Sequence, residues 1–228
     1  MKFDLHIHTV VGSSDSSLSV EQLISESKRI GLDGVCLTEH GGGWSSDKVH
    51  QLFNDSGLVV IPALEVNTEF GHVIAIGLES HIPGIHKIDF LRNVINQRDG
   101  ILILAHPMRN LFNKPPYDTN LIYKNQDNRP DSALEASKHE VFDYVDFIEV
   151  TNGANTTEEN EFALDVSKIL NKRGTGGSDS HSIQGIGKSL TVFESEIYNT
   201  DSLIKNLKLG KFYPAEGLNK GKMLPFTK

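Results

Sequence analysis

The sequence predicts an α/β protein built on a largely parallel sheet. Short apolar segments of strand type alternate with longer segments of helix type along the whole chain, without an internal repeat or a low-complexity linker. Ionisable residues directly follow several predicted strands, which is typical of α/β enzymes whose loops converge on one face. These observations alone do not distinguish a closed barrel from an open sheet.

Seven segments are predicted as strands because each is short, apolar and rich in β-branched residues. These are residues 3–7, 34–38, 58–66, 72–78, 101–104, 146–150 and 189–193. A first helix is expected to begin after Ser19, which forms a capping box with Gln22, and to end near Gly31. Helical spacing predicts five further helices, at residues 46–54, 88–97, 132–143, 156–172 and 201–209.

The regular pattern stops between residues 110 and 131, where Pro115, Pro116 and Pro130 are scattered among Asn and Asp. A polar loop of this length is either an active-site lid or a disordered insert. We therefore expect one domain over residues 1–217, with the 110–131 insertion near its site, followed by a basic tail at 218–228.

Composition excludes several classes of function. The 228-residue chain has a net charge of −8 and no run of Lys or Arg, so a broad footprint for duplex nucleic acid is not expected. The single cysteine, Cys36, excludes an internal disulfide and a thiolate-rich zinc site, and its apolar neighbours predict a buried packing role. No signal-peptide pattern and no apolar segment of ~20 residues is found. We expect a cytoplasmic location and no membrane partner; the sequence does not indicate an oligomeric state.

Histidines and acids recur just after the apolar segments from one end of the chain to the other. They are His6, His8, Asp15, His40, Glu65, His72, His106, Asp179 and His181. His6 and His8 lie two apart on a strand and share one face, so that both can reach one ion, and Asp179 and His181 have the same spacing. Imidazole mixed with carboxylate suits zinc, manganese or iron. The pattern predicts a site for two to three divalent metal ions.

The expected charge and coordination favour hydrolysis of a phosphorylated substrate. Three carboxylates would leave about three positive charges uncompensated if three divalent ions were bound, which favours an anionic substrate. Nine side chains cannot fill every coordination position around three ions, and open positions allow water to bind with a pKa lowered to ~7.

Other polar residues have two interpretations each. Glu39 either orients a ligand or faces solvent. Arg109 either holds a phosphate oxygen or pairs with Asp118 at the surface. Asn152 either faces the site or, as its Asn-Gly sequence favours, belongs to a plain turn. The remaining histidines are expected at the surface: His50, His81, His86 and His139.

The ordered set of motifs resembles the PHP (polymerase and histidinol phosphatase) family of metal-dependent phosphoesterases. The motifs are Asp4-Leu5-His6-Ile7-His8-Thr9, Ser14-Asp15, Thr38-Glu39-His40, Pro62-Ala63-Leu64-Glu65-Val66, Gly71-His72, Ala105-His106-Pro107 and Gly177-Ser178-Asp179-Ser180-His181. The resemblance implies a distorted (β/α)7 barrel with a trinuclear metal site. Two departures concern Glu39, where the family more often has Asp, and two extra residues before Ser14-Asp15.

The resemblance also implies how the ligands are divided among the three ions. One ion would be bound by His6, His8, Glu65 and Asp179, a second by Glu65, His72 and His106, and a third by Asp15, His40 and His181. Glu65, Asp179, His181 and Arg109 are the expected catalytic residues.

The first functional hypothesis is a metal-dependent phosphatase that acts on small phosphomonoesters. A 3′–5′ exonuclease or nucleotide phosphodiesterase that acts on short nucleic-acid ends is an alternative. A third enzymatic hypothesis is the hydrolysis of amides or lactones, as in amidohydrolases. The sequence shows no candidate for the bridging lysine of amidohydrolases. A non-catalytic metal-binding regulatory module belongs to a different class.

Overall fold

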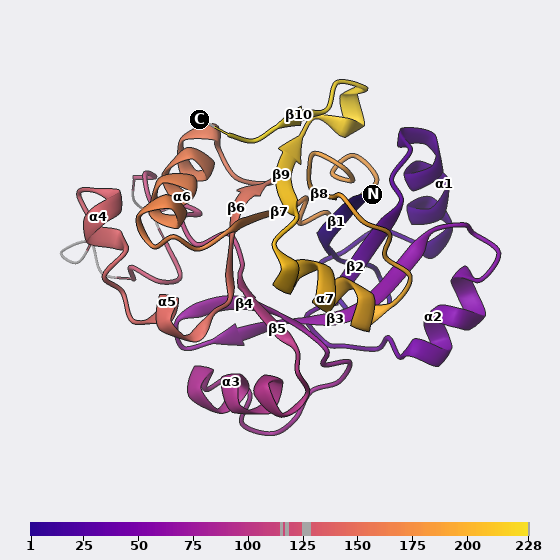
Figure 1. Cartoon of the computed structure of the whole chain (residues 1–228), viewed down its shortest axis with the longest axis horizontal. Coiled ribbons are helices and arrows are strands. Elements are labelled where there is room, and N and C mark those ends of the chain that lie inside the picture. The colour runs from indigo at the N-terminus through magenta and orange to yellow at the C-terminus, as the bar shows by residue number, and fades with distance from the viewer. Residues whose placement is uncertain (115, 117–118, 125–128, 228) are drawn as a thin grey trace.

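A mixed, curled β-sheet that forms a half-barrel lies at the centre of the structure, with most helices around its outside and the last helix across its front (Figure 1). The structure is a computed structural model that describes residues 1–114, 116, 119–124 and 129–227. Within these residues the sheet contains ten strands: β1 (Lys2–Ile7), β2 (Gly34–Glu39), β3 (Val59–Thr68), β4 (Gly71–Ile76), β5 (Ile101–Leu104), β6 (Phe147–Asn152), β7 (Gly174–Gly177), β8 (Ser189–Phe193), β9 (Phe212–Glu216) and β10 (Leu224–Pro225).

The helices follow the strands in the alternating order expected of an α/β protein, which confirms the predicted fold class. They are α1 (Val20–Ile30), α2 (Ser46–Phe53), α3 (Ile88–Gln97), α4 (Ala133–Ala136), α5 (Val141–Tyr144), α6 (Thr157–Ile169) and α7 (Thr200–Leu209), with a 3-10 turn at Leu218–Lys220. The capping box predicted at the start of α1 is present, and Gly31 ends this helix in the left-handed conformation with φ 70°.

The strand order is β10-β9-β8-β1-β2-β3-β4-β5-β6-β7. Strands β1 to β3 are parallel, as are β5 to β7, but β4 is antiparallel to both of its neighbours. The expected largely parallel sheet is therefore mixed, because β3 and β4 are joined by a short turn that leaves no room for a crossover helix. The structure confirms the α/β class but not the exact number of seven strand–helix units in the expected (β/α)7 barrel.

The half-barrel curls so far that the chain after β7 returns to β1. The amide of Asp179 donates a hydrogen bond to the His6 carbonyl at 2.8 Å, and the amide of His8 donates to the Ser180 carbonyl at 3.0 Å. The buried Asp4 carboxylate accepts a further bond from the Ser178 amide at 2.8 Å. These bonds bring the first strand against the segment around residue 179.

Several regions differ from the elements predicted by the sequence: β9, β10 and the 3-10 turn between them follow the last predicted helix, and two further differences lie earlier in the chain. The helix expected at 132–143 is interrupted between α4 and α5, where the His139 ring nitrogen accepts a hydrogen bond from the Val141 amide and starts a new turn. Strand β7 was not predicted because three of its four residues are glycine. A side chain at Gly177 would meet the Cβ of His6 at 2.4 Å, so this strand has to lack side-chain volume there.

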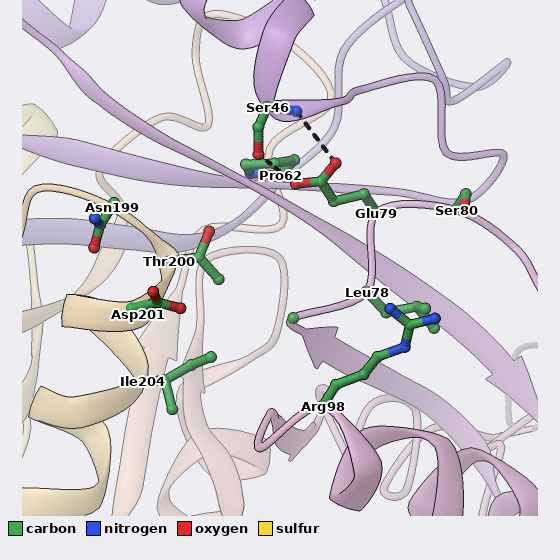
Figure 2. Close-up of a pocket in the computed structure, with 11 residues that line it drawn as sticks. Ser46, Pro62, Leu78, Glu79, Ser80, Arg98, Asn199, Thr200, Asp201 and Ile204 are labelled. Carbon is green, nitrogen blue, oxygen red and sulfur yellow. Dashed lines mark hydrogen bonds between the residues drawn. The ribbon is translucent and has the colours of Figure 1, made fainter.

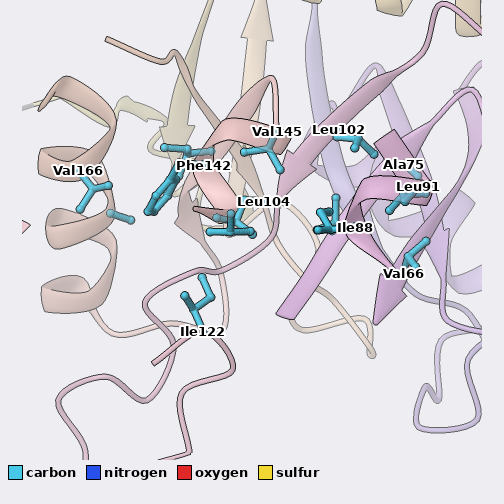
Figure 3. Packing of buried hydrophobic residues seen from close by; sticks show 14 of the residues in the cluster. Val66, Ala75, Ile88, Leu91, Leu102, Leu104, Ile122, Phe142, Val145 and Val166 are labelled. Carbon is cyan, nitrogen blue, oxygen red and sulfur yellow. The ribbon is translucent and has the colours of Figure 1, made fainter. Parts of the chain in front are cut away.

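Apolar residues on alternating positions cover both faces of the sheet. Leu102 and Leu104 of β5 pack on one face in the cluster of Figure 3, together with Leu91 of α3 and Val166 of α6. On the opposite face a second cluster packs against α7; it includes Ile61, Ala63, Ile74, Ile76, Ile101, Ile103, Leu203 and Leu207. Alternation along β3 places Glu65 on this second face, directly beyond Ala63.

The loop from 110 to 131 has no helix or strand among its described residues. Two of its residues pack inward: Ile122 and Tyr123 are buried and belong to the same cluster as Leu104. Cys36 is also buried, as expected, and burial raises the pKa of its thiol.

No helix in the described part of the chain has the length and apolar character needed to cross a membrane.

Candidate metal centre

The candidate ligands come together at one edge of the sheet, although they are spread over most of the chain. His6, His40 and Asp179 lie at or just after the carboxyl ends of β1, β2 and β7. Glu65 lies within β3, which extends to Thr68, one residue beyond the position that pairs with Glu39 at the end of β2. His72 lies near the start of β4, but this strand runs in the opposite direction and pairs His72 with Asn67. The reversed strand therefore delivers its histidine to the same edge.

Glu65 lies at the middle of the cluster and is 2% exposed. Its Oε1 atom lies 2.9 Å from Nδ1 of His72 and 2.9 Å from Nε2 of His106. These three side chains form one group whose ligand atoms lie within 4.8 Å of one another. The group matches the set expected for the second ion.

A second group shares the other oxygen of Glu65. Oε2 lies 3.4 Å from Nε2 of His6 and 3.3 Å from Nε2 of His8. Oδ1 of Asp179 lies 3.4 Å from Nε2 of His6 and 3.2 Å from Nε2 of His8. Two imidazoles and two carboxylates thus face one point, and all four residues are buried. This group matches the set expected for the first ion.

The third group consists of His8, His40 and His181. Asp15 lies at its margin: Oδ2 is 3.4 Å from Nε2 of His181 and 3.6 Å from Nε2 of His40, and the Asp15 side chain is 57% exposed. The structure thus brings all nine predicted residues together, with Asp15 furthest out. Mixed nitrogen and oxygen donors of this kind fit divalent zinc, manganese or iron.

Glu39 is fully buried and does not face solvent. Its carboxylate accepts hydrogen bonds from the Ser13 hydroxyl at 2.6 Å and from the Trp44 indole at 2.8 Å. The same Ser13 hydroxyl lies 3.0 Å from Nδ1 of His8. Glu39 therefore orients a candidate ligand through Ser13, which fixes which ring nitrogen of His8 faces the cluster.

Glu149 of β6 supports two candidate ligands and was not singled out from the sequence. Oε1 lies 3.0 Å from Nδ1 of His6, and Oε2 accepts the His106 amide at 2.8 Å. The only available signal was an acidic residue inside the apolar sequence from Phe147 to Val150. Such a residue is buried only when its charge is compensated, which is itself a sign of a site.

Arg109 is oriented by acceptors from three residues. Its Nη2 atom donates to Asp179 Oδ2 at 2.5 Å and to Asn152 Oδ1 at 2.8 Å, and its Nε donates to Asn155 Oδ1 at 2.9 Å. Asp118, the alternative partner, lies outside the described residues. Asn152 ends β6 and its amide also donates to Glu149 at 2.8 Å, so it faces the site and is not merely a turn residue.

The backbone is left-handed at two candidate ligands. His106 has φ 31° and Asp179 has φ 53°, in a region that residues with a side chain seldom occupy. Each residue lies two residues beyond the end of a strand, β5 for His106 and β7 for Asp179, and its side chain belongs to the cluster. Such conformations persist where the surrounding structure holds them, most often at functional sites.

The charges of the cluster are strongly coupled. Burial alone would lower the pKa of His6, but three nearby carboxylates, Asp179 foremost, raise it well above its ordinary value. Conversely, burial would raise the pKa values of Glu65 and Asp179, but the imidazoles, His6 foremost, hold both well below the usual range. The cluster therefore keeps its carboxylates ionised and attracts positive charge, either protons on histidine or bound cations.

The remaining histidines lie outside the three groups. His50, His81 and His86 are exposed as expected, and His139 is half-buried between Phe70 and Tyr123.

A cavity of about 680 Å³ between the beginnings of α2 and α7 also lies apart from the cluster (Figure 2). It is lined by Ser46, Arg98 and Asp201 among others and contains none of the candidate ligands.

We expect Glu149→Gln to lower the affinity for divalent metal by about 10- to 100-fold, because the amide cannot serve as acceptor for both His6 and the His106 amide. Titration calorimetry with zinc or manganese measures this change. Glu158→Gln is the matched control, since Glu158 is exposed in the first turn of α6. Equal affinities of both variants and the parent protein would contradict the role given to Glu149.

We also expect metal affinity to rise with pH. Asp179 and its neighbours raise the pKa of His6, and a raised pKa of His8 adds a second site where protons compete with metal. Binding must release these protons, so affinity should increase by up to about tenfold per pH unit for each proton released. Calorimetry in buffers of different ionisation enthalpy counts the protons, and an affinity independent of pH between 6 and 8 would refute this expectation.

Comparison with known structures places the fold among previously solved proteins. PsfC from Pseudomonas syringae superimposes with a TM-score of 0.60 at 19% identity, over 89% of this chain and 87% of that protein. A candidate metal-dependent phosphoesterase from Bifidobacterium adolescentis gives 0.57 at 16% identity, over 90% and 95%. An amidohydrolase from Chromobacterium violaceum, solved with sulfate and no metal, gives 0.57 at 14% identity, over 80% and 88%.

Sequence comparison is more specific. The uncharacterized protein MJ1587 from Methanocaldococcus jannaschii is 28% identical over 120 residues, which cover 47% of this chain and 68% of that protein. Residues 157–212 match the PHP-associated region. Residues 4–165 match the PHP domain and contain seven of the nine candidate ligands, and the chain therefore belongs to the PHP domain family.

Proposed function

We propose that this protein is a metal-dependent phosphoesterase that hydrolyses small phosphomonoesters at a site for two to three divalent ions, drawn from zinc, manganese and iron. Membership of the PHP family supports a metal-dependent hydrolase. The observation that carries the finer proposal is the sharing of ligands: Glu65 and His8 each belong to two of the three groups. Residues shared between groups would hold adjacent ions near one another, so that both could act on one phosphoryl group.

The chain's own residues have distinct roles in this proposal. The three groups would hold the ions, which supply Lewis acidity to activate water and to stabilise charge on the phosphoryl group. Glu65, which belongs to two groups, and Asp179 would help to hold the ions. Nη1 of Arg109 has no hydrogen-bond partner within the described residues and can donate to a phosphate oxygen, while Nη2 holds Asp179.

With two ions bound, in the two groups that contain Glu65, His181 would hold no metal and could supply the proton for the leaving oxygen. Its side chain is 30% exposed, and Nδ1 lies 3.0 Å from the Asp179 carbonyl, which orients the ring. Nε2 faces Asp15 across 3.4 Å and remains accessible to substrate. A partly exposed imidazole that holds no metal and adjoins the ions of the other two groups can deliver a proton to the departing alcohol.

A second candidate function is cleavage at short nucleic-acid ends. A cavity of about 540 Å³ adjoins Asn152 and Asn155, which hold Arg109, and is also lined by Lys188, Lys220 and Lys222. No acidic group of the described residues forms an ion pair with these three lysines. Ammonium groups in a chain of net charge −8 could attract a phosphodiester backbone.

Turnover assays on metal-loaded and chelated protein test these functions. The panel contains a chromogenic phosphomonoester, a phosphodiester, a single-stranded oligonucleotide and an amide. Metal-dependent turnover of the phosphomonoester supports the phosphatase. Cleavage of only the oligonucleotide would favour the nuclease over the phosphatase, and cleavage of only the amide would favour an amidohydrolase. Metal binding without any turnover would indicate a regulatory module.

We expect His6→Ala and Asp179→Ala to reduce phosphomonoester hydrolysis by at least about 10³-fold, because each removes a ligand from the group that also contains His8 and Glu65. Circular dichroism should show that both variants remain folded. His50→Ala provides the control, since His50 is exposed and lies outside the groups. Normal turnover and full metal content in either ligand variant would show that the assignment is wrong.

A further inference from the structure

A cavity of about 440 Å³ opens directly beside the candidate metal centre. Its lining includes His40 and Glu65, which belong to different ligand groups. Asn67 lies two residues beyond Glu65 on β3, so strand alternation places both side chains on the same face. Asn67 is exposed and extends the wall of the cavity from the metal centre outward.

The opposite wall is the loop at residues 81–86, which precedes α3, and it is fixed in place. Ile85 is buried and Ile82 is partly buried against the cluster that contains Leu91. His81 Nε2 donates to the His40 carbonyl at 2.7 Å, and the His86 carbonyl accepts the Glu69 amide at 3.2 Å. The wall therefore exists before any ligand arrives.

The cavity lining has little charge. Ile82 and Pro83 are apolar, and the lining contains no Lys or Arg. Val66 and Ile85 also border the cavity but are buried in the core cluster that contains Leu91. Glu65 is the only acid, and its carboxylate is engaged by the histidines around it. An anionic group placed here would find no cationic side chain in the lining to replace its water, whereas an apolar group would lose little on transfer.

We propose that this cavity binds the alcohol part of the substrate, and that this part is neutral and substantially apolar. The proposal rests on the phosphoesterase function proposed above and specifies its substrate class. With a phosphoryl group at the metal centre, the leaving alcohol extends past His40 and Glu65 into the space between Asn67 and Ile82. Imidazoles at the rim, such as that of His86, can hydrogen-bond to a hydroxyl or a ring nitrogen without requiring charge.

Binding of two phosphonates to the metal-loaded protein tests the inference. One probe is 2-phenylethylphosphonate, whose tail is neutral and apolar; the other is 3-phosphonopropionate, whose tail ends in a carboxylate. Calorimetry should show the phenylethyl probe binding at least about tenfold more tightly, since burial of a phenyl group in an apolar pocket supplies that difference. Equal affinities, tighter binding of the carboxylate probe, or no binding of the phenylethyl probe would overturn the inference.

Three variants test whether the preference arises in this cavity. Asn67→Lys places an ammonium group in the cavity and should abolish or reverse the preference by improving the carboxylate probe about tenfold. Asn93→Lys adds the same charge on the exposed face of α3 and should change neither affinity. Ile82→Ala adds no charge to the cavity and should weaken only the binding of the phenylethyl probe. An unchanged preference in Asn67→Lys would also overturn the inference.

The outcomes separate this inference from the proposed function. Phosphomonoester turnover combined with equal probe affinities would remove the cavity from the substrate site and leave the phosphatase intact. A clear preference for the phenylethyl probe without any turnover would support the cavity as a ligand site and reject the phosphatase.

Discussion

One buried carboxylate organises the site. Glu65 is almost inaccessible to water, yet five imidazoles lie within 3.4 Å of its two oxygens: those of His6, His8, His40, His72 and His106. An isolated ionised carboxylate in such a place would be strongly destabilising. Its charge must be balanced by protons on the surrounding histidines or by cations, and the imidazole nitrogens that face it are placed to hold either.

The fold departs from regular strand–helix alternation where this arrangement requires it. The hairpin of β3 and β4 replaces a crossover helix and brings His72 next to Glu65. The glycines of β7 allow that strand to approach β1, since any side chain at Gly177 would collide with His6 and Glu149. The left-handed residues His106 and Asp179 then turn two further side chains inward. Each irregularity serves the placement of a candidate ligand.

Much of this could be predicted from the sequence because ligand positions follow strand ends. The pairs at His6 and His8 and at Asp179 and His181, and the single acid Glu65, were recognisable from spacing and from their place after apolar segments. Residues that act through others were harder to find. Glu149 carries no motif, and Glu39 could be assigned a supporting role only once its burial and its contact with Ser13 were known.

Other features depend on tertiary contacts that no local pattern encodes. Strand β7 lacks the side chains that create periodicity, so only its pairing with β6 identifies it. The partners of Arg109 come from β6, the loop after it and the segment after β7. The direction of β4 is decided by the length of the turn before it. Local propensity determines individual elements well, whereas strand direction and long-range polar partners are decided by the packed structure.

The most direct measurement is anomalous X-ray diffraction from crystals grown with manganese or zinc, recorded at the absorption edge of the metal. The account predicts separate peaks in the group formed by His6, His8, Glu65 and Asp179 and in the group formed by Glu65, His72 and His106. A metal-saturated crystal without density between these residues, or with ions bound only elsewhere on the surface, would contradict it.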